Sequence, residues 1–173
     1  MDRRWMLVPL VGAVSLLPAC GQSERGTALI QGTQPGSKIS GTATFIPTAN
    51  GLKVSVQVAH VPPGLHGLHI HEGGSCGQGG ASAGGHFNPH QVKHGFLPRD
   101  GLSGAHAGDF GNITVGSDGT GTVTLTLPGL TLHEGPHSVA GRSIILHEKP
   151  DDFSQPTGNA GARIGCGLVT VNR

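Results

Sequence analysis

Alternating apolar and polar residues recur along most of this 173-residue chain, and this pattern most limits its fold. Over 54–58 three valines alternate with polar residues, and over 122–127 three threonines alternate with a valine and two leucines. Successive side chains of a β-strand point to opposite faces, so a period of two indicates strands with one buried face. After the first twenty residues, no segment keeps a helical period for three turns.

Turn-forming residues separate the alternating segments. Gly and Pro make up about a quarter of the chain, and pairs such as Asn50-Gly51 and Pro128-Gly129 are typical of turns. We expect eight strands, at 27–31, 38–46, 52–60, 66–71, 111–116, 121–127, 142–147 and 164–171. The fold class is therefore all-β, an antiparallel Greek-key sandwich or barrel. The stretches 73–109 and 148–163 are too long for hairpins, and we expect both to be functional loops.

The N-terminus resembles a secretory signal. Arg3 and Arg4 precede an apolar run that ends at Leu17 and is shorter than the roughly 20 residues of a membrane-spanning helix. The exit Leu17-Pro18-Ala19-Cys20 resembles the bacterial lipoprotein signal, in which the Cys is lipidated. We expect a signal peptide over 1–19, a tether over 20–26 with lipidated Cys20, and one domain over 27–173. The alternative is an ordinary signal with a chance Cys.

This reading predicts export to the periplasm or cell envelope, with a membrane contact made only through acyl chains on Cys20. The formal net charge of +1, the 3% of aromatic residues and the absence of Tyr argue against a nucleic-acid partner. Without 1–19 the chain is formally neutral, so any steering of a charged partner depends on local charges. The sequence leaves both a monomer and a homodimer open.

The cysteines agree with export. Assigning Cys20 to lipid leaves Cys76 and Cys166. In an exported chain two remaining cysteines most simply form a disulfide, and two free thiols are the alternative.

Histidine is the outlier of the composition, with 11 residues, as many as Lys and Arg together. His69 and His71 stand at i and i+2 of an expected strand, about 6.7 Å apart on one face, where both can reach one ion. A second set of three imidazoles and one carboxylate is complete for a closed, structural zinc site: His86, His94, His106 and Asp109. Solvated surface histidines are the alternative for either group.

His147, at the end of the expected strand 142–147, and Arg163, three residues before Cys166, complete the candidate residues. Taken with the segments 64–72, 86–89, 108–112, 147–149 and 158–163, they resemble the copper/zinc superoxide dismutase family. The resemblance runs through 27–173 in the family's order.

The resemblance implies two metal sites. It implies the copper ligands His69, His71, His86 and His147, and the zinc ligands His86, His94, His106 and Asp109. His86 would then bridge both metals as an imidazolate. Asp151 is similar to a carboxylate that orients one histidine of each site, Arg163 to an arginine that guides the anion, and Cys76 and Cys166 to the family's disulfide.

The activity implied is dismutation of superoxide to O2 and H2O2, with copper alternating between two valences and zinc structural. His86 and Arg163 would be the catalytic residues, the first handling a proton and the second attracting the anion. Two other readings are an exported copper/zinc binding or delivery domain without this activity, and an adhesive or structural sandwich, which leaves the histidines unexplained.

One motif competes with this reading. Residues 133–137 spell H-E-x-x-H, which serves zinc proteases only on a helix. Gly135 and Pro136 oppose a helix there, so we expect a loop. We expect His60 and His90 to be surface or turn residues and His66 to be a structural hydrogen-bonding group.

Overall fold

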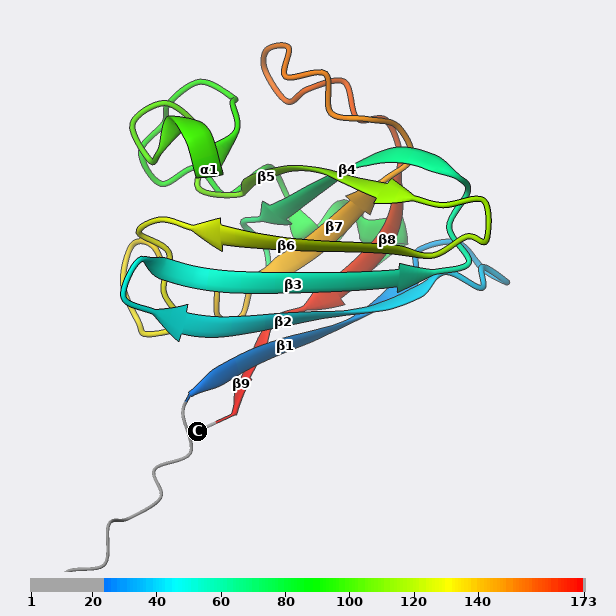
Figure 1. The fold of residues 1–173 in the computed structure, drawn as a ribbon, viewed down its shortest axis with the longest axis horizontal. Coiled ribbons are helices and arrows are strands. Elements are labelled where there is room, and N and C mark those ends of the chain that lie inside the picture. The colour runs from blue at the N-terminus through cyan, green and yellow to red at the C-terminus, as the bar shows by residue number, and fades with distance from the viewer. Residues whose placement is uncertain (1–23, 173) are drawn as a thin grey trace, which may run out of the picture.

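The structure is a computed structural model that describes residues 24–172, drawn in Figure 1. The expected signal peptide, the lipidation residue Cys20 and the start of the tether lie outside the described residues. The strands are β1 (Arg25–Gly32), β2 (Ser40–Thr48), β3 (Gly51–Ala59), β4 (Gly64–His71), β5 (Asp109–Val115), β6 (Gly121–Leu127), β7 (Ser143–His147), β8 (Arg163–Leu168) and β9 (Thr170–Asn172).

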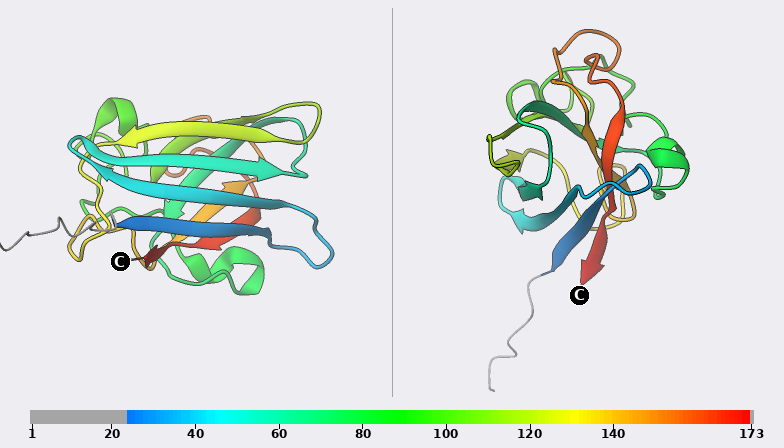
Figure 2. Two further views of the ribbon diagram at one scale, coloured as in Figure 1. Left: turned by 60° about the horizontal axis from the view of Figure 1, so that its bottom comes forward. Right: turned by 90° about the vertical axis from the view of Figure 1, so that its right-hand side faces the viewer.

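Eight strands close into one antiparallel barrel. Their order is β2-β3-β6-β5-β4-β7-β8-β1, and pairing of β1 with β2 completes the ring. The chain passes from β3 to β4 without pairing them, and β6 and β5 lie between the two, with β6 beside β3, which is the Greek-key arrangement. In the left view of Figure 2, β1, β2, β3 and β6 lie in front of β4, β7 and β8. The predicted fold class is confirmed.

The buried face of the strands fills the barrel. On β3, Val54 and Val56 are fully buried, while Ser55 between them is only partly covered. Phe45 of β2 and Leu68 and Ile70 of β4 belong to the same apolar cluster. Burial of these side chains supplies the main driving force for closing the barrel.

The strand limits differ from the prediction mainly at the ends of the chain. β1 begins at Arg25, so the last two residues of the expected tether are in the strand, where they pair with Asn172 and Val171. The expected last strand is divided into β8 and β9, and both lie against β1. A 3-10 helix, η1 (Gln78–Ala83), and a four-residue helix, α1 (Leu97–Asp100), lie in the long loop. Neither is long enough to produce a helical period. No helix among residues 24–172 is long and apolar enough to cross a membrane.

The two long loops lie next to β4 and β7. Cys76 of the first loop is bonded to Cys166 of β8, which confirms the predicted disulfide. The second loop, between β7 and β8, is the segment coloured orange at the top of Figure 1. The first loop, the outer face of β4 and the end of β7 carry the candidate histidines, and the second loop carries Asp151.

Candidate metal centre

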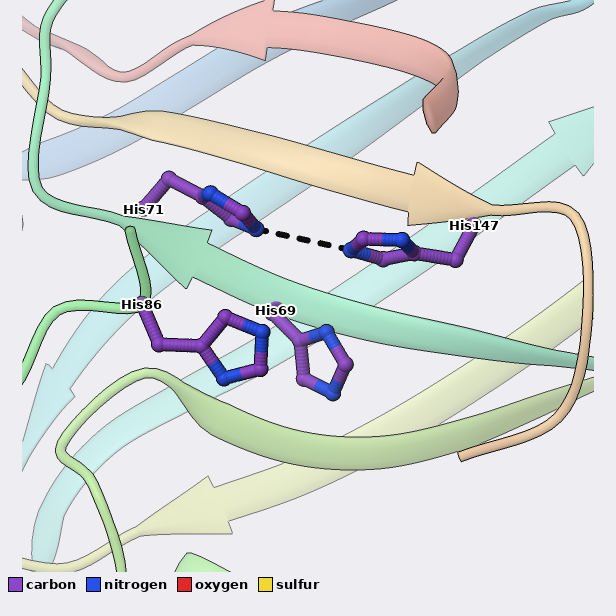
Figure 3. Close-up of side chains that lie close together, drawn as sticks. All are labelled: His69, His71, His86 and His147. Atoms are coloured by element: carbon purple, nitrogen blue, oxygen red, sulfur yellow. Dashed lines mark hydrogen bonds between the residues drawn. The ribbon is translucent and has the colours of Figure 1, made fainter. Parts of the chain in front are cut away.

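Strand β4 presents His69 and His71 on the side away from the core. Leu68 and Ile70, which alternate with them, point into the barrel. Strand β7 lies next to β4 and ends at His147. The long loop brings His86 against β4, where the backbones of His71 and His86 form a β-bridge. Figure 3 shows the four imidazoles facing one another.

Hydrogen bonds fix which nitrogen of each ring faces the group. His71 donates from Nδ1 to the carbonyl of Gly84 (2.9 Å), and His147 donates from Nδ1 to that of Gly161 (3.2 Å). His69 donates from Nε2 to Asp151 Oδ2 (2.8 Å). Each neutral ring has therefore used its one N–H, and its other nitrogen is an unprotonated ligand atom.

These unprotonated nitrogens converge. The Nε2 atoms of His71 and His147 lie 3.4 Å apart, and His69 Nδ1 is buried with no hydrogen-bond partner among the described residues. One ligand atom from each of the four histidines lies within 4.8 Å of every other. Buried polar atoms are normally paired, so this buried, unpaired nitrogen fits a group that binds a cation.

Burial keeps these rings neutral. It lowers the pKa of His69 to about 4, of His71 to about 2 and of His147 to about 3. Metal binding requires neutral imidazole, so this group is ready for a cation at neutral pH.

A second group surrounds Asp109 at the start of β5. Asp109 Oδ1 lies 2.9 Å from His86 Nδ1 and 3.1 Å from His106 Nδ1, and Oδ2 lies 2.9 Å from His94 Nδ1. Backbone N–H groups of Gly95 and His106 also donate to Oδ2. The three Nδ1 atoms and the carboxylate form a set whose ligand atoms lie within 4.8 Å of one another, and its four members are buried. Three imidazoles and one carboxylate suit a tetrahedral zinc ion.

Charge is balanced differently in this second group. Burial raises the pKa of the Asp109 carboxyl, but hydrogen bonds from His106, His86 and His94 outweigh it and hold the pKa far below its usual range. Burial likewise lowers the pKa of His94, but its hydrogen bonds to Asp109 and Asp151 prevail and raise it to about 9. Without a cation, a proton on His94 compensates the two carboxylates.

His86 is the one residue common to both groups. Its Nδ1 faces Asp109, and its ring centroid lies 4.1 Å from that of His69 in the other group. The remaining nitrogen, Nε2, is left for the first group.

Asp151 connects the two groups by accepting hydrogen bonds from one histidine of each. Its Oδ2 accepts from His69 Nε2, and its Oδ1 accepts from His94 Nε2 at 2.9 Å. Asn112 of β5 holds the backbone of Asp151 at both its N–H (2.7 Å) and its carbonyl (2.9 Å). One carboxylate thereby fixes the orientation of one ring in each group.

Arg163, the first residue of β8, lies beside the first group. Its guanidinium donates to the carbonyls of Gly80 and Gly84 in the long loop, the latter at 2.6 Å. The Cys76–Cys166 disulfide ties the same loop to β8. A positive charge is therefore held rigidly next to the histidines.

The structure brings the candidate ligands together in two groups, and comparison with known proteins decides the family. The copper/zinc superoxide dismutase (SODC) family matches residues 39–169. The chain belongs to the copper/zinc superoxide dismutase family. As a member it is an enzyme that acts on superoxide and whose metals are copper and zinc, in agreement with the donor sets.

Relatives of the family cover most of the chain. "Superoxide dismutase [Cu-Zn] 2" of Brassica juncea is 39% identical over 153 residues, 84% of this chain and 96% of the relative. "Extracellular superoxide dismutase [Cu-Zn]" of Haemonchus contortus is 39% identical, covering 82% and 79%, and that of Caenorhabditis elegans is 38% identical, covering 94% and 76%. The crystal structure of the clock protein EA4 superposes with a TM-score of 0.75 at 32% identity, covering 89% of this chain and 99% of that one.

The remaining histidines also follow expectation. His66 lies between two backbone carbonyls, with Nδ1 2.9 Å from that of His147 and Nε2 2.8 Å from that of Pro62, as a structural group. Residues 133–137 form no helix, which removes the basis of the protease motif.

Sequence reasoning identifies Asp151 but misses two side-chain amides that position the candidate ligands and Asp151. Gln155 clamps the backbone of His94, accepting from its N–H (3.0 Å) and donating to its carbonyl (2.9 Å). Asn112 does the same for Asp151. A single sequence offers no signal for either, because an amide that holds a distant backbone has no characteristic spacing.

Proposed function

We propose that copper is held by His69, His71, His86 and His147, and zinc by His86, His94, His106 and Asp109. The support is the direction of the ring nitrogens: three copper-side imidazoles donate their N–H outward and keep an unprotonated nitrogen inside. Four imidazoles suit copper in both valences, and three imidazoles with a carboxylate suit zinc.

Copper, when bound, supplies a one-electron couple that converts superoxide to O2 in one half-reaction and to H2O2 in the other. The protein's part is to hold the ligands, attract the anion and provide a proton. His86 is placed for the last task, because Asp109 and the zinc-side residues hold its Nδ1 while Nε2 faces the copper-side group. Nε2 then holds a proton between half-reactions and gives it to the reduced product.

Arg163 attracts and orients superoxide. The guanidinium is charged at every working pH, and carbonyls of Gly80 and Gly84 fix it beside the copper-side histidines. Asp151 keeps His69 and His94 in register and touches no substrate.

The protein acts outside the cytosol in this proposal. The Cys76–Cys166 disulfide supports export, since such bonds persist in oxidising compartments. Two relatives carry the word "extracellular" in their names. We further propose removal of 1–19, a lipid on Cys20 and a tether up to β1, which would hold the enzyme at a membrane of the cell envelope.

Metal analysis of the purified mature protein, paired with a superoxide-decay assay, tests the function. We expect one copper and one zinc per chain and rapid decay that requires the copper. A protein that binds both metals without accelerating decay would be a metal-delivery domain instead. Mass spectrometry of the N-terminus checks the lipid: an acylated Cys20 supports the anchor, and a free N-terminus at another residue excludes it.

A further inference from the structure

Two imidazoles outside the metal centre face each other. The Nε2 atoms of His90 and His137 lie 2.7 Å apart, and their ring centroids are 4.9 Å apart. His90 lies in the long loop between β4 and β5, and His137 lies in the loop between β6 and β7. His90 is exposed and His137 half-buried, so the pair is open to solvent. Neither ring takes part in the proposed copper or zinc site.

The loop that carries His90 is tightly built. Asn88 accepts a hydrogen bond from the Val92 N–H (3.1 Å) and donates one to the Val92 carbonyl (2.9 Å), closing a short loop around His90. Gln91 adds a backbone hydrogen bond to the Asn88 carbonyl. The position of the His90 backbone is therefore defined by its own segment.

Arg142 joins this loop to the loop of His137. Its guanidinium stacks 3.6 Å from the centre of the Phe87 ring, and its Nε donates to the carbonyl of Ser138 at 2.8 Å. Phe87 lies three residues before His90, and Ser138 directly follows His137. The same arginine also donates to the carbonyl of Glu72. The two imidazoles are thus presented by segments held against each other, and little ordering is left for a ligand to impose.

We propose that His90 and His137 form a third transition-metal site, which binds Zn²⁺ or Cu²⁺ through their Nε2 atoms. Imidazole is the protein ligand that these two cations share. With Zn–N bonds of about 2.0–2.1 Å, two nitrogens on a tetrahedral ion lie about 3.3 Å apart. A small rotation of the exposed His90 ring provides this separation.

The site is of a different kind from the buried centre. Among the described residues, no third histidine, cysteine or carboxylate has a ligand atom near enough to join the pair. Water must fill the other coordination positions, so the cation exchanges readily. Such a site suits the transient capture of a cation at the surface, on the outer part of the loop that also carries the zinc-side residues His86 and His94.

Equilibrium dialysis of the copper- and zinc-loaded protein against Zn²⁺ at micromolar concentration and pH 7.5 tests the proposal. We expect one more equivalent of zinc per chain in the wild type than in His90→Ala or His137→Ala. Each variant should weaken this binding by about tenfold or more. With Cu²⁺ as the probe, the wild type should show an additional tetragonal copper signal in electron paramagnetic resonance that both variants lack.

His133→Ala is the matched control. His133 belongs to the same loop and the same H-E-x-x-H segment, but its exposed side chain pairs with Glu24 instead. We expect this variant to keep the extra equivalent. Loss of the extra equivalent in His133→Ala, its retention in both His90→Ala and His137→Ala, or its absence from the wild type would each overturn the proposal. In the last case the 2.7 Å contact is a hydrogen bond between two imidazoles. Superoxide decay, which none of the three variants should change, shows that the fold and the buried metals are intact.

Discussion

His71 and Arg163 donate hydrogen bonds to the same backbone carbonyl, that of Gly84. The carbonyl lies 2.9 Å from His71 Nδ1 and 2.6 Å from Arg163 Nη2. A histidine of the proposed copper site and the Arg163 guanidinium are therefore positioned by one peptide group of the long loop. Any change that moves this peptide shifts the proposed copper ligand and the positive charge of Arg163 together.

Replacing Arg163 tests the attraction of superoxide. We expect Arg163→Ala to lower kcat/KM by roughly tenfold or more, because the local positive charge is lost while the formal charge elsewhere is unchanged. The wild-type rate should fall as ionic strength rises, and the variant should lose most of this dependence. Stopped-flow superoxide decay over a series of salt concentrations measures both.

Arg163→Lys is the control for charge against position. Lysine keeps the charge but cannot reach the carbonyls of Gly80 and Gly84 with a planar fork. Its rate should lie between those of the wild type and Arg163→Ala. A wild-type rate that does not respond to salt would contradict electrostatic steering.

The shared histidine should matter to both cations. In His86→Ala each site loses one of four ligands, so we expect weak binding of copper and of zinc and loss of activity. Metal analysis after dialysis measures the occupancy of each. Intact one-to-one copper and zinc in this variant would refute the bridge.

Gly158 provides a test of Asp151 that replaces none of the proposed ligand residues. A methyl group at 158 would collide with Asp151 Oδ1 and lie 2.7 Å from His94 Nε2, so Gly158→Ala must break their hydrogen bond. We expect zinc affinity to fall by roughly 10–100-fold. Competition with a chelator measures the change.

Gly161→Ala is the matched control for Gly158→Ala. Gly161 has φ 77°, close to the φ 73° of Gly158, so both variants carry the same backbone strain. At 161 the added methyl meets only two flexible side chains, Lys149 at 3.2 Å and Glu148 Oε2 at 3.4 Å. Equal loss of zinc affinity in the two variants would show that strain, and not Asp151, is responsible.

The metal-free protein should be most stable near neutral pH. The pKa values of His69, His71 and His147 are lowered to about 4, 2 and 3 by burial, so below about pH 6.5 the unfolded chain binds protons that the folded chain does not. The free energy of unfolding therefore decreases as the pH is lowered below 6.5, by at most about 1.4 kcal/mol per pH unit for each histidine. The pKa of His94 is raised to about 9, so its contribution is complete below pH 6.5 and is lost between pH 6.5 and 9.

Urea unfolding of the metal-free protein between pH 5 and 9 measures this profile. Zinc should remove the loss on the alkaline side, because the cation replaces the proton on His94. A free energy of unfolding that stays constant from pH 6.5 down to 5 would contradict neutral, buried imidazoles.

The disulfide should stabilise both the fold and the site. Cys76 and Cys166 are 90 positions apart, and closing such a loop contributes about 4–5 kcal/mol in the chain-entropy model. We expect the double Cys→Ser variant to melt roughly 10–20 °C lower. Its kcat/KM should also fall, because the loop that holds Arg163 is released. Calorimetry and the decay assay on metal-loaded protein check each effect, and an unchanged melting temperature would exclude a stabilising role.

The barrel was accessible from the sequence because its strands carry the alternation of half-buried β-structure. The alternation of Val54 and Val56 with polar residues indicates a buried face, and turn pairs such as Asn50-Gly51 indicate where strands end. The lack of such a pattern predicts both long loops. It does not predict the small elements η1 and α1, since one turn of helix contains no period.

A pair of histidines at i and i+2 is common and predicts little alone, but a loop with three histidines and an aspartate indicates a metal site, and the resemblance to the family implies the full set of ligands. The hydrogen bonds that orient them could not be found in this way. The contacts of His94 with Gln155 and of Asp151 with Asn112 join residues that are distant in sequence, so only the closed fold brings them together. The pairing of His90 with His137 arises in the same way, from two loops that no local rule connects.

The closure of the barrel by β1 and β2 uses none of the ligand side chains, since the apolar cluster lies inside and the histidines lie outside. Maturation can therefore proceed in two stages, in which the barrel folds first and copper and zinc bind afterwards. Replacement of one cation by another does not require the scaffold to be dismantled.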